Sequence, residues 1–343
     1  MSRQTVTPEN TRTYGDGTDR RMPWNVMGGT LQTEYPSVDA AMAAAGLDYE
    51  VEVRDLFSAR AADNAIDRPR NLIQAPELRT IVRPMPDGTE KVLAAVGKRY
   101  TPIQNREAFS VADALVGEFG SKIAGAADFR GGHSSLLVVD LQRPIRLDLP
   151  GGTEDVTDMH LLVRNAHDGS AALTFAVTGI RIACTNAVHA AVAGAQRAWR
   201  ISHTPNAAGR VDLARQAILR GMAYADAVEA KAQAMVDQPM VDAEFAKIVA
   251  GLFPVPEGKD ETKAGQRALE VRAEITGLYA TSPTLDGTRG TVWGGYNAVT
   301  EWLDWGRKVK GDEAVARAEA QVDLANPYAR RSAKVWELFA SAV

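Results

Sequence analysis

Arginine side chains are concentrated between residues 181 and 220, where the sequence has six arginines and a single acidic residue. The whole chain has a formal net charge of −4, so this basic segment lies within an otherwise acidic protein. Guanidinium groups bind phosphate oxygens, and a neighbouring aromatic ring can stack on an unpaired base. The segment therefore indicates a local surface for single-stranded nucleic acid, whereas the overall charge argues against a histone-like binder.

The run RAWRISH, residues 197–203, alternates between apolar and polar positions and predicts a short strand. On such a strand Arg197, Trp199 and Ile201 share one face, and Arg200 lies on the other. A guanidinium beside an indole ring could hold a phosphate and a base together. Alternatively, Trp199 fills the core and the arginines pair with acidic residues elsewhere, and the sequence leaves both interpretations open.

A second, smaller group of basic and aromatic residues consists of Lys98, Arg99 and Tyr100. It leads into a loop with Gln104 and Asn105, whose amides are expected to form a turn and to cap the following helix. The predicted nucleic-acid-binding residues come from both groups and are Lys98, Arg99, Tyr100, Arg181, Arg197, Trp199, Arg200 and Arg210.

Cys184, the only cysteine, indicates a different chemistry. Together with Asn186 and either His189 or His203, it could form a thiolate nucleophile assisted by a histidine. However, Cys184 ends the apolar strand predicted over 171–184, where cysteine commonly packs as a small hydrophobic residue. Cys184, His203 and Asn186 are therefore weak catalytic candidates, and the sequence favours a protein that is not an enzyme.

No motif in the sequence indicates a metal ion or a cofactor. All five histidines lie between His133 and His203, but none has the spacing of a helical metal site or an evident third ligand. Phosphate-binding loop motifs are absent, and the glycine pairs at 131–132, 151–152 and 294–295 fit turns. We expect neither a bound metal nor a cofactor.

The composition is typical of a protein that buries a sizeable hydrophobic core and resides in a reducing compartment. The chain has 343 residues, of which 45% are hydrophobic, and its single cysteine excludes an intramolecular disulfide. Residues 1–30 lack the pattern of a signal peptide, and no apolar run reaches the roughly 18 residues of a membrane span. These features predict a cytoplasmic protein without a membrane partner.

The predicted elements change along the chain from strands to helices. After a polar N-terminal arm over 1–36, Ser37 is expected to cap a short helix that Gly46 closes. Single strands are predicted over 47–56 and 197–203. Hairpins are predicted over 80–100, 122–142 and 158–184, and a long connection over 58–77 precedes the first of them. The helix predictions are 106–119, 187–196, 209–237, 241–252, 262–280, 295–308 and 331–342.

This order predicts an α+β fold in which antiparallel β-hairpins pack with a helix and a helical C-terminal region follows. The expected domains are the arm over 1–36, an α+β core over 37–205 and a helical region over 206–343. In the third hairpin, Asp168 and Gly169 are the predicted turn residues.

Several sequence blocks occur in an order seen in one protein family. The blocks are VDAAMAAAGLDYEVE, VGKRYTPIQNREAFSVADALV, RIACTNAVHAA, RISHT and TVWGGYNAVTEWLDW. In these blocks the chain resembles the DUF932 family of phage/plasmid-like proteins, over about residues 24–340. The matching positions are Tyr100, Pro102, Gln104, Asn105, Cys184, Asn186, His203, Thr204, Trp293, Asn297, Ala298 and Glu301. The chain departs from the family at Ala187 and Val188, where Thr-Leu is frequent.

The resemblance implies a setting in the replication and recombination modules of mobile elements, and it implies no activity. The order of elements is also similar in outline to Rad52-like single-strand annealing proteins. We therefore expect a phage or plasmid protein that binds single-stranded nucleic acid and forms a homo-oligomer, in the cytoplasm of a bacterial host. The alternatives are an enzyme with a Cys/His/Asn pocket and a structural or protein-interaction phage protein.

Overall fold

The computed structural model describes residues 11–13, 19–21, 35–59, 72–181, 187–188, 198–205, 225–255, 257–258, 261–311, 313, 316–317 and 327–343. The strands are β1 Thr11–Thr13, β2 Asp19–Arg21, β3 Glu52–Ala59, β4 Leu72–Pro84, β5 Glu90–Gly97, β6 Lys122–Phe129, β7 Ser134–Asp140, β8 Ile145–Asp148, β9 Glu154–Ala166, β10 Leu173–Arg181, β11 Ala187–Val188 and β12 Ala198–Ile201. The helices are α2 Val38–Ala45, α3 Asn105–Phe119, a helical segment over 225–237, α5 Asp242–Leu252, α6 Lys263–Thr281, η2 Pro283–Leu285, α7 Val292–Glu301, the π-helical turn η3 Trp302–Gly306 and α9 Pro327–Ala340. The chain is therefore α+β, with helices in its C-terminal region, as predicted.

The larger sheet is antiparallel and has the order β11-β10-β9-β7-β6, with β12 also paired to β10 and β8 paired to the start of β9. Its register places buried apolar residues opposite one another, as in the row formed by Phe175, Val163 and Leu137. Because side chains alternate along a strand, such rows form one continuous apolar face. The hairpins predicted over 122–142 and 158–184 are confirmed, whereas β8 was not predicted.

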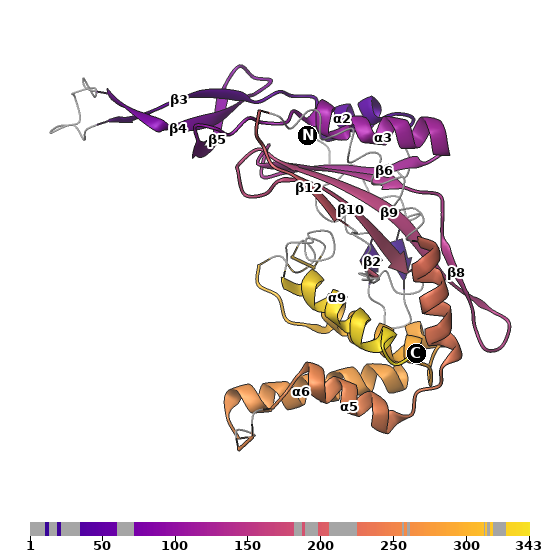
Figure 1. Ribbon diagram of the computed structural model, residues 1–343. Helices are drawn as coiled ribbons and strands as arrows, with labels where there is room; N and C mark the ends of the chain where they lie inside the picture. The colour runs from indigo at the N-terminus through magenta and orange to yellow at the C-terminus, as the bar shows by residue number, and fades with distance from the viewer. Residues whose placement is uncertain are drawn as a thin grey trace.

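A smaller antiparallel sheet of β3, β4 and β5 projects away from the rest of the molecule (Figure 1). We call it the β3–β5 sheet. Its base is closed by four buried side chains, which are Val51, Ile81, Leu93 and Val96. β5 pairs only with Leu78–Pro84 of β4, so the outer part of the sheet is a two-stranded ribbon of β3 and β4.

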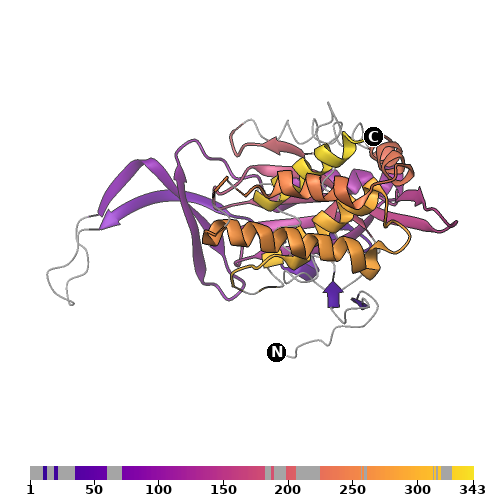
Figure 2. The same cartoon turned by 90° about the horizontal axis from the view of Figure 1, so that it is seen from below.

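Helices lie on both sides of the larger sheet (Figure 1). α2 and α3 run along one side, and Figure 2 shows the orange and yellow C-terminal helices lying across the other. On α3 the predicted apolar positions Phe109, Ala112 and Leu115 are fully buried in a core that continues to α7 and α9. None of the described helices has the length and apolar character needed to cross a membrane.

Local sequence signals account for several of these elements. The Ser37 side chain accepts a hydrogen bond from the Ala40 N–H (3.1 Å), and Gly46 ends α2 in the left-handed conformation with φ of 65°. Gly120 ends α3 in the same way, with φ of 67°. These caps satisfy backbone groups that have no partner inside the helix, which explains why the helix boundaries were predictable.

The connection predicted over 58–77 is wrong at both of its ends, because β3 continues to Ala59 and β4 already begins at Leu72, whereas residues 60–71 lie outside the described part. The register passes from Asp55 opposite Arg79 to Phe57 opposite Gln74, so β4 carries extra residues around Pro76. Proline cannot donate a ladder hydrogen bond and is tolerated at such an irregularity. Pro76 therefore interrupts the strand pattern in the sequence without ending the strand.

The helix predicted over 187–196 is also wrong where the chain is described. Ala187 and Val188 form β11 and pair with Ile180 and Gly179 of β10. Hydrogen bonding to the edge of β10 outweighs the intrinsic helix preference of an alanine-rich run. The residues after 188 in this prediction lie outside the described part, as does the predicted helix over 209–237 before residue 225.

The glycine pair at 294–295 does not form a turn, unlike the pairs at 131–132 and 151–152, and instead lies inside α7. A Cβ atom on Gly295 would lie 2.8 Å from Cε1 of Phe339 and 2.9 Å from the sulfur of Met240. A Cβ atom on Gly294 would lie 2.2 Å from the carbonyl oxygen of Thr288. Both glycines are therefore required by close packing of the helix.

We expect Gly294→Ala to lower the free energy of unfolding by about 1–3 kcal/mol, because a backbone carbonyl cannot move aside as a flexible side chain can. Urea unfolding followed by circular dichroism would measure the change. Gly277→Ala in α6 is the matched control, since no heavy atom lies within 4 Å of its added Cβ. The control should be neutral or stabilising, and a Gly294→Ala protein as stable as wild type would contradict the packing argument.

A candidate binding pocket between the two sheets

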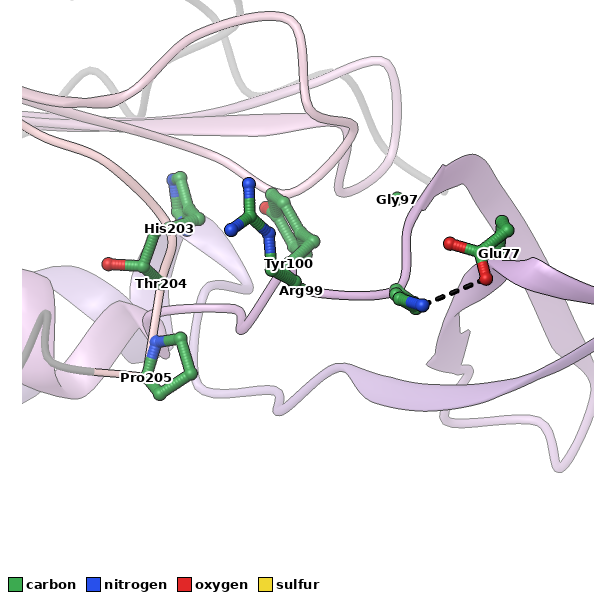
Figure 3. A pocket seen from close by; sticks show the side chains of 8 residues that line it. Glu77, Gly97, Arg99, Tyr100, His203, Thr204 and Pro205 are labelled. Carbon is green, nitrogen blue, oxygen red and sulfur yellow. Dashed lines mark hydrogen bonds and ion pairs between the residues drawn. The ribbon is translucent and has the colours of Figure 1, made fainter.

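An open pocket of about 620 Å3 lies where the end of β5 meets the residues that follow β12 (Figure 3). Its lining residues are Glu77, Gly97, Lys98, Arg99, Tyr100, His203, Thr204 and Pro205. The pocket joins the small basic and aromatic group at Lys98–Tyr100 to the end of the arginine-containing strand β12. The fold thus brings together two of the segments that the sequence singled out separately.

Hydrogen bonds and ring stacking hold the two walls of the pocket together. The N–H groups of Thr101 and Ile103 donate to the carbonyl oxygen and to Nδ1 of His203, both at 3.2 Å. The rings of Tyr100 and His203 stack with their centroids 4.9 Å apart and an interplanar angle of 16°. The Tyr100 hydroxyl donates to the carbonyl oxygen of Ala166 at 3.0 Å, which anchors this wall to the end of β9. Both walls therefore have fixed relative positions.

Arg99 provides the pocket with an available positive charge. It is exposed, and among the described residues its side chain makes no ion pair or hydrogen bond. Figure 3 shows it extended beside the rings of Tyr100 and His203. Lys98 forms an ion pair with Glu77 at 2.8 Å, but both side chains are at least half exposed, and such pairs contribute little stability. An anion could therefore bind Arg99 directly and compete with Glu77 for Lys98.

Burial makes His203 neutral at physiological pH. The residue is only 6% exposed, and burial lowers its pKa to about 4. Because Nδ1 accepts the hydrogen bond from Ile103, the proton of the neutral ring is on Nε2. Burial also raises the pKa of Tyr100 above its usual value, and the nearby negative charge of Asp168 raises it further. The positive charge of the pocket therefore comes from Arg99 and Lys98.

Behind the pocket, Asn105 is the centre of a group of buried polar side chains. Its Nδ2 donates to the carbonyl oxygen of Leu47 at 3.0 Å, which determines the orientation of its amide. Its Oδ1 accepts hydrogen bonds from Ser135 Oγ (2.7 Å), Asn165 Nδ2 (3.2 Å) and His167 Nε2 (3.0 Å). We call Asn105, Ser135, Asn165 and His167 the Asn105 cluster. It joins the start of α3 to β7 and to the end of β9.

The prediction that Asn105 caps α3 is wrong. The helix begins at Asn105 itself, and the capping position is Gln104, whose side chain makes no capping hydrogen bond. Instead, the Gln104 amide bonds both the N–H and the C=O of Val51, each at 3.0 Å. An exposed helix end can be satisfied by water, whereas buried polar groups need protein partners. The two amides therefore bond neighbouring elements and hold the base of the β3–β5 sheet on α3.

Trp199 and Arg200 lie on β12, which pairs with one end of β10. Trp199 is opposite Phe175, is half-buried and packs against the main core. Arg200 is opposite Thr174, is exposed and makes no side-chain ion pair or hydrogen bond with a described residue. β12 thus presents Arg200 to the surface and directs Trp199 toward the core.

The other predicted site residues cannot be placed in the pocket. Arg181 ends β10 opposite Thr157, but only its backbone is described. The predicted residues outside the described part are Cys184, Asn186, His189, Arg197 and Arg210. Their proposed roles, including the cysteine–histidine chemistry, stay predictions.

Sequence reasoning missed the Asn105 cluster and the lining residues Glu77, Thr204 and Pro205. The available signal was weak, because Asn165 and His167 lie in the polar run 164–169 at a predicted hairpin turn, where such residues are ordinary. Their meeting with Asn105 depends on the packing of α3 across β7 and β9, which sequence periodicity does not specify.

Comparison with known proteins gives a family and no function. A family model described as a domain of unknown function (DUF932) matches residues 92–325, which include most of the pocket lining and the Asn105 cluster. No curated protein sequence and no solved structure matches the chain. The similarity in outline to Rad52-like annealing proteins therefore stays a prediction.

Proposed function

The chain belongs to the DUF932 family, whose description states no activity, and we propose that it binds single-stranded nucleic acid at the pocket between the two sheets. The observation that carries the proposal is the exposed guanidinium of Arg99, without an ion-pair partner in the described part of the chain, beside the stacked rings of Tyr100 and His203. A guanidinium binds phosphate oxygens in a charge-assisted manner. Aromatic edges and a proline ring nearby can contact an unstacked base.

The pocket and β12 together provide groups for more than one nucleotide. Arg200 is exposed on β12, three residues before the pocket residue His203, and supplies a second cation. The Thr204 hydroxyl and the Pro205 ring line the same pocket and can contact sugar, phosphate or base. These groups recognise features that every nucleotide carries, so we expect binding with little dependence on base sequence.

A labelled single-stranded oligonucleotide in a fluorescence anisotropy titration tests this function. We expect wild-type protein to bind, with an affinity that falls as salt is raised. The double variant Arg99→Ala/Arg200→Ala should bind about tenfold more weakly or worse at low salt. The slope of log affinity against log salt should become shallower by about 0.7 for each lost phosphate contact.

The matched control is Lys247→Ala/Lys263→Ala, which removes the same charge from exposed positions on α5 and α6, two helices that Figure 1 shows on the opposite side of the molecule from β5. It should bind almost as well as wild type. Absence of binding by the wild-type protein at low salt would contradict the proposed function. Equal weakening by both double variants would contradict its assignment to this pocket.

We also propose that the protein uses this binding to anneal complementary single strands. The support is the succession of hairpins, helix and arginine-containing strand, which is similar in outline to annealing proteins. Mixing two complementary labelled oligonucleotides with the protein should accelerate duplex formation. Binding without acceleration would leave the binding proposal intact and exclude annealing.

A further inference from the structure

Two short segments of the C-terminal region contain basic residues and no acidic ones. Residues 305–311, WGRKVKG, have three basic residues, and so do residues 327–336, PYARRSAKVW. The whole chain has a net charge of −4, so both segments differ in charge from the rest of the protein. The structure places them side by side, because Cζ of Arg307 lies 3.6 Å from the ring centroid of Tyr328 at the start of α9. The two segments therefore form one region of the surface.

Residues 307–310 present two lysines to the solvent. Arg307 is buried and extended, with φ of −69° and ψ of 146°, and its carbonyl oxygen accepts a hydrogen bond from Nη2 of Arg317 at 2.9 Å. Burial then alternates, since Lys308 and Lys310 are exposed and Val309 between them is half-buried. In an extended chain the two lysine Cα atoms are at most about 7 Å apart. This separation is comparable to that of neighbouring phosphates in a nucleotide strand.

The first turns of α9 add two more exposed basic side chains. Arg331 and Lys334 follow Tyr328 at intervals of three residues, so the three are neighbours along the helix surface. Cζ of Arg331 lies 5.9 Å from the ring centroid of Phe253, which leaves its guanidinium at the surface beside an aromatic edge. We call Lys308, Lys310, Arg331 and Lys334 the C-terminal basic patch.

The positive charges of the C-terminal basic patch are not neutralised within the described part of the chain. None of its four side chains makes an ion pair or a hydrogen bond with a described residue. Other exposed basic side chains do find partners, as Arg106 pairs with Asp39 and Arg146 with Glu154. Four neighbouring cations without acidic partners repel one another, and a bound anion would relieve this repulsion. The patch is therefore suited to a partner with several negative charges.

The surroundings of the patch favour a phosphate backbone over a lipid surface. Of the exposed acidic residues on these segments, Glu313 already pairs with Arg317 at 2.6 Å, and Glu337 lies one turn beyond Lys334. Leu338 is the one large apolar side chain of α9 that is exposed in the described structure. Helices that bind a lipid surface insert a broad apolar face in addition to their charges. The patch offers charge with little apolar area, as a polyanion requires.

We propose that the C-terminal basic patch binds the phosphates of a nucleic-acid strand, as a second contact surface besides the pocket. The inference rests on the proposed function, because both surfaces then bind the same class of polymer. Figure 1 shows α9 below the larger sheet, whereas β5, whose last residue lines the pocket, lies at its upper left. Ammonium and guanidinium groups neutralise phosphates without contacting the bases, so this surface is independent of base sequence.

Anisotropy titrations of the full chain with a long single-stranded DNA oligonucleotide test the patch. Lys308→Ala/Lys310→Ala should bind roughly tenfold more weakly at low salt, and the slope of log affinity against log salt should become shallower by about 0.7 for each lost contact. Lys308→Arg/Lys310→Arg keeps both charges and should bind like wild type. Lys247→Ala/Lys263→Ala removes the same charge from exposed positions on α5 and α6 and should bind almost as well as wild type.

The possible outcomes separate the patch from the pocket. If Lys308→Ala/Lys310→Ala binds like wild type while Arg99→Ala/Arg200→Ala binds weakly, the patch is excluded and the pocket stands. The reverse result supports the patch and excludes the pocket. If the wild-type chain binds no oligonucleotide, both proposals fall. Titration with vesicles that contain an anionic lipid tests the other partner, and loss of vesicle binding by the patch variant with unchanged affinity for the oligonucleotide would overturn the proposal.

Discussion

Replacing Asn105 with alanine should lower the free energy of unfolding by roughly 3–5 kcal/mol, the largest effect that we expect from a single substitution. Asn105 is fully buried, and its amide bonds Leu47, Ser135, Asn165 and His167. Alanine would leave the Leu47 carbonyl and the Ser135 hydroxyl without this partner in a site that water does not reach. Urea unfolding monitored by circular dichroism would measure the loss.

Ser110→Ala is the control on the same helix. Ser110 is exposed, and within the described part of the chain its hydroxyl donates only to the carbonyl oxygen of Glu107. Its replacement should change the free energy of unfolding by less than about 0.5 kcal/mol. If Asn105→Ala also cost less than about 1 kcal/mol, the Asn105 cluster would not be the joint between α3, β7 and β9.

Acidification from pH 6.5 to pH 4 should strongly destabilise the folded protein through its buried histidines. Burial lowers the pKa of His167 to about 4, with a smaller contribution from His203, and burial lowers the pKa of His203 to about 4. In the unfolded chain both should titrate near their ordinary pKa of about 6.5. Between these values the unfolded chain binds more protons, so stability falls as the pH is lowered and is unaffected by these groups above about pH 7.

The magnitude follows from about 1.4 kcal/mol for each unit of pKa difference, which is on the order of 3 kcal/mol for each histidine. His167→Gln/His203→Asn removes both titrations. The glutamine amide can still donate toward Asn105, and the asparagine Oδ1 can still accept from the Ile103 N–H. Urea midpoints between pH 4 and 7 should vary less in this variant than in wild type. The remaining slope should come partly from His160, whose pKa burial also lowers to about 4.

The contacts of the block Tyr100, Pro102, Gln104 and Asn105 explain what it does in the structure. Tyr100 bonds the end of β9 and stacks on His203, and Gln104 bonds the backbone of Val51. Asn105 bonds the cluster behind the pocket. The block therefore positions the pocket wall, and it leaves the neighbouring residue Arg99 to contact a ligand.

Signals that act over a few residues determined much of the fold. Apolar runs joined by turn residues such as Asp168 and Gly169 predicted the hairpins of the larger sheet, and caps such as Ser37 and Gly46 predicted the ends of helices. The basic and aromatic group at Lys98–Tyr100 could also be recognised, because its chemistry depends only on residue types. These signals can be read from the sequence because all residues of a strand pattern or a helix cap lie within one short segment of the chain.

Only the tertiary structure decided which polar groups meet. The sequence predicts a cap at Asn105, but buried partners in β7, in β9 and in the segment after α2 bond its side chain instead. It predicts a turn at Gly294, but Thr288 approaches so closely that the helix α7 requires glycine there. Likewise, Lys98–Tyr100 and His203 form one pocket because β12 pairs with β10 and the loop before α3 bonds His203. Contacts between distant segments depend on the packing of whole elements, and no local pattern encodes that packing.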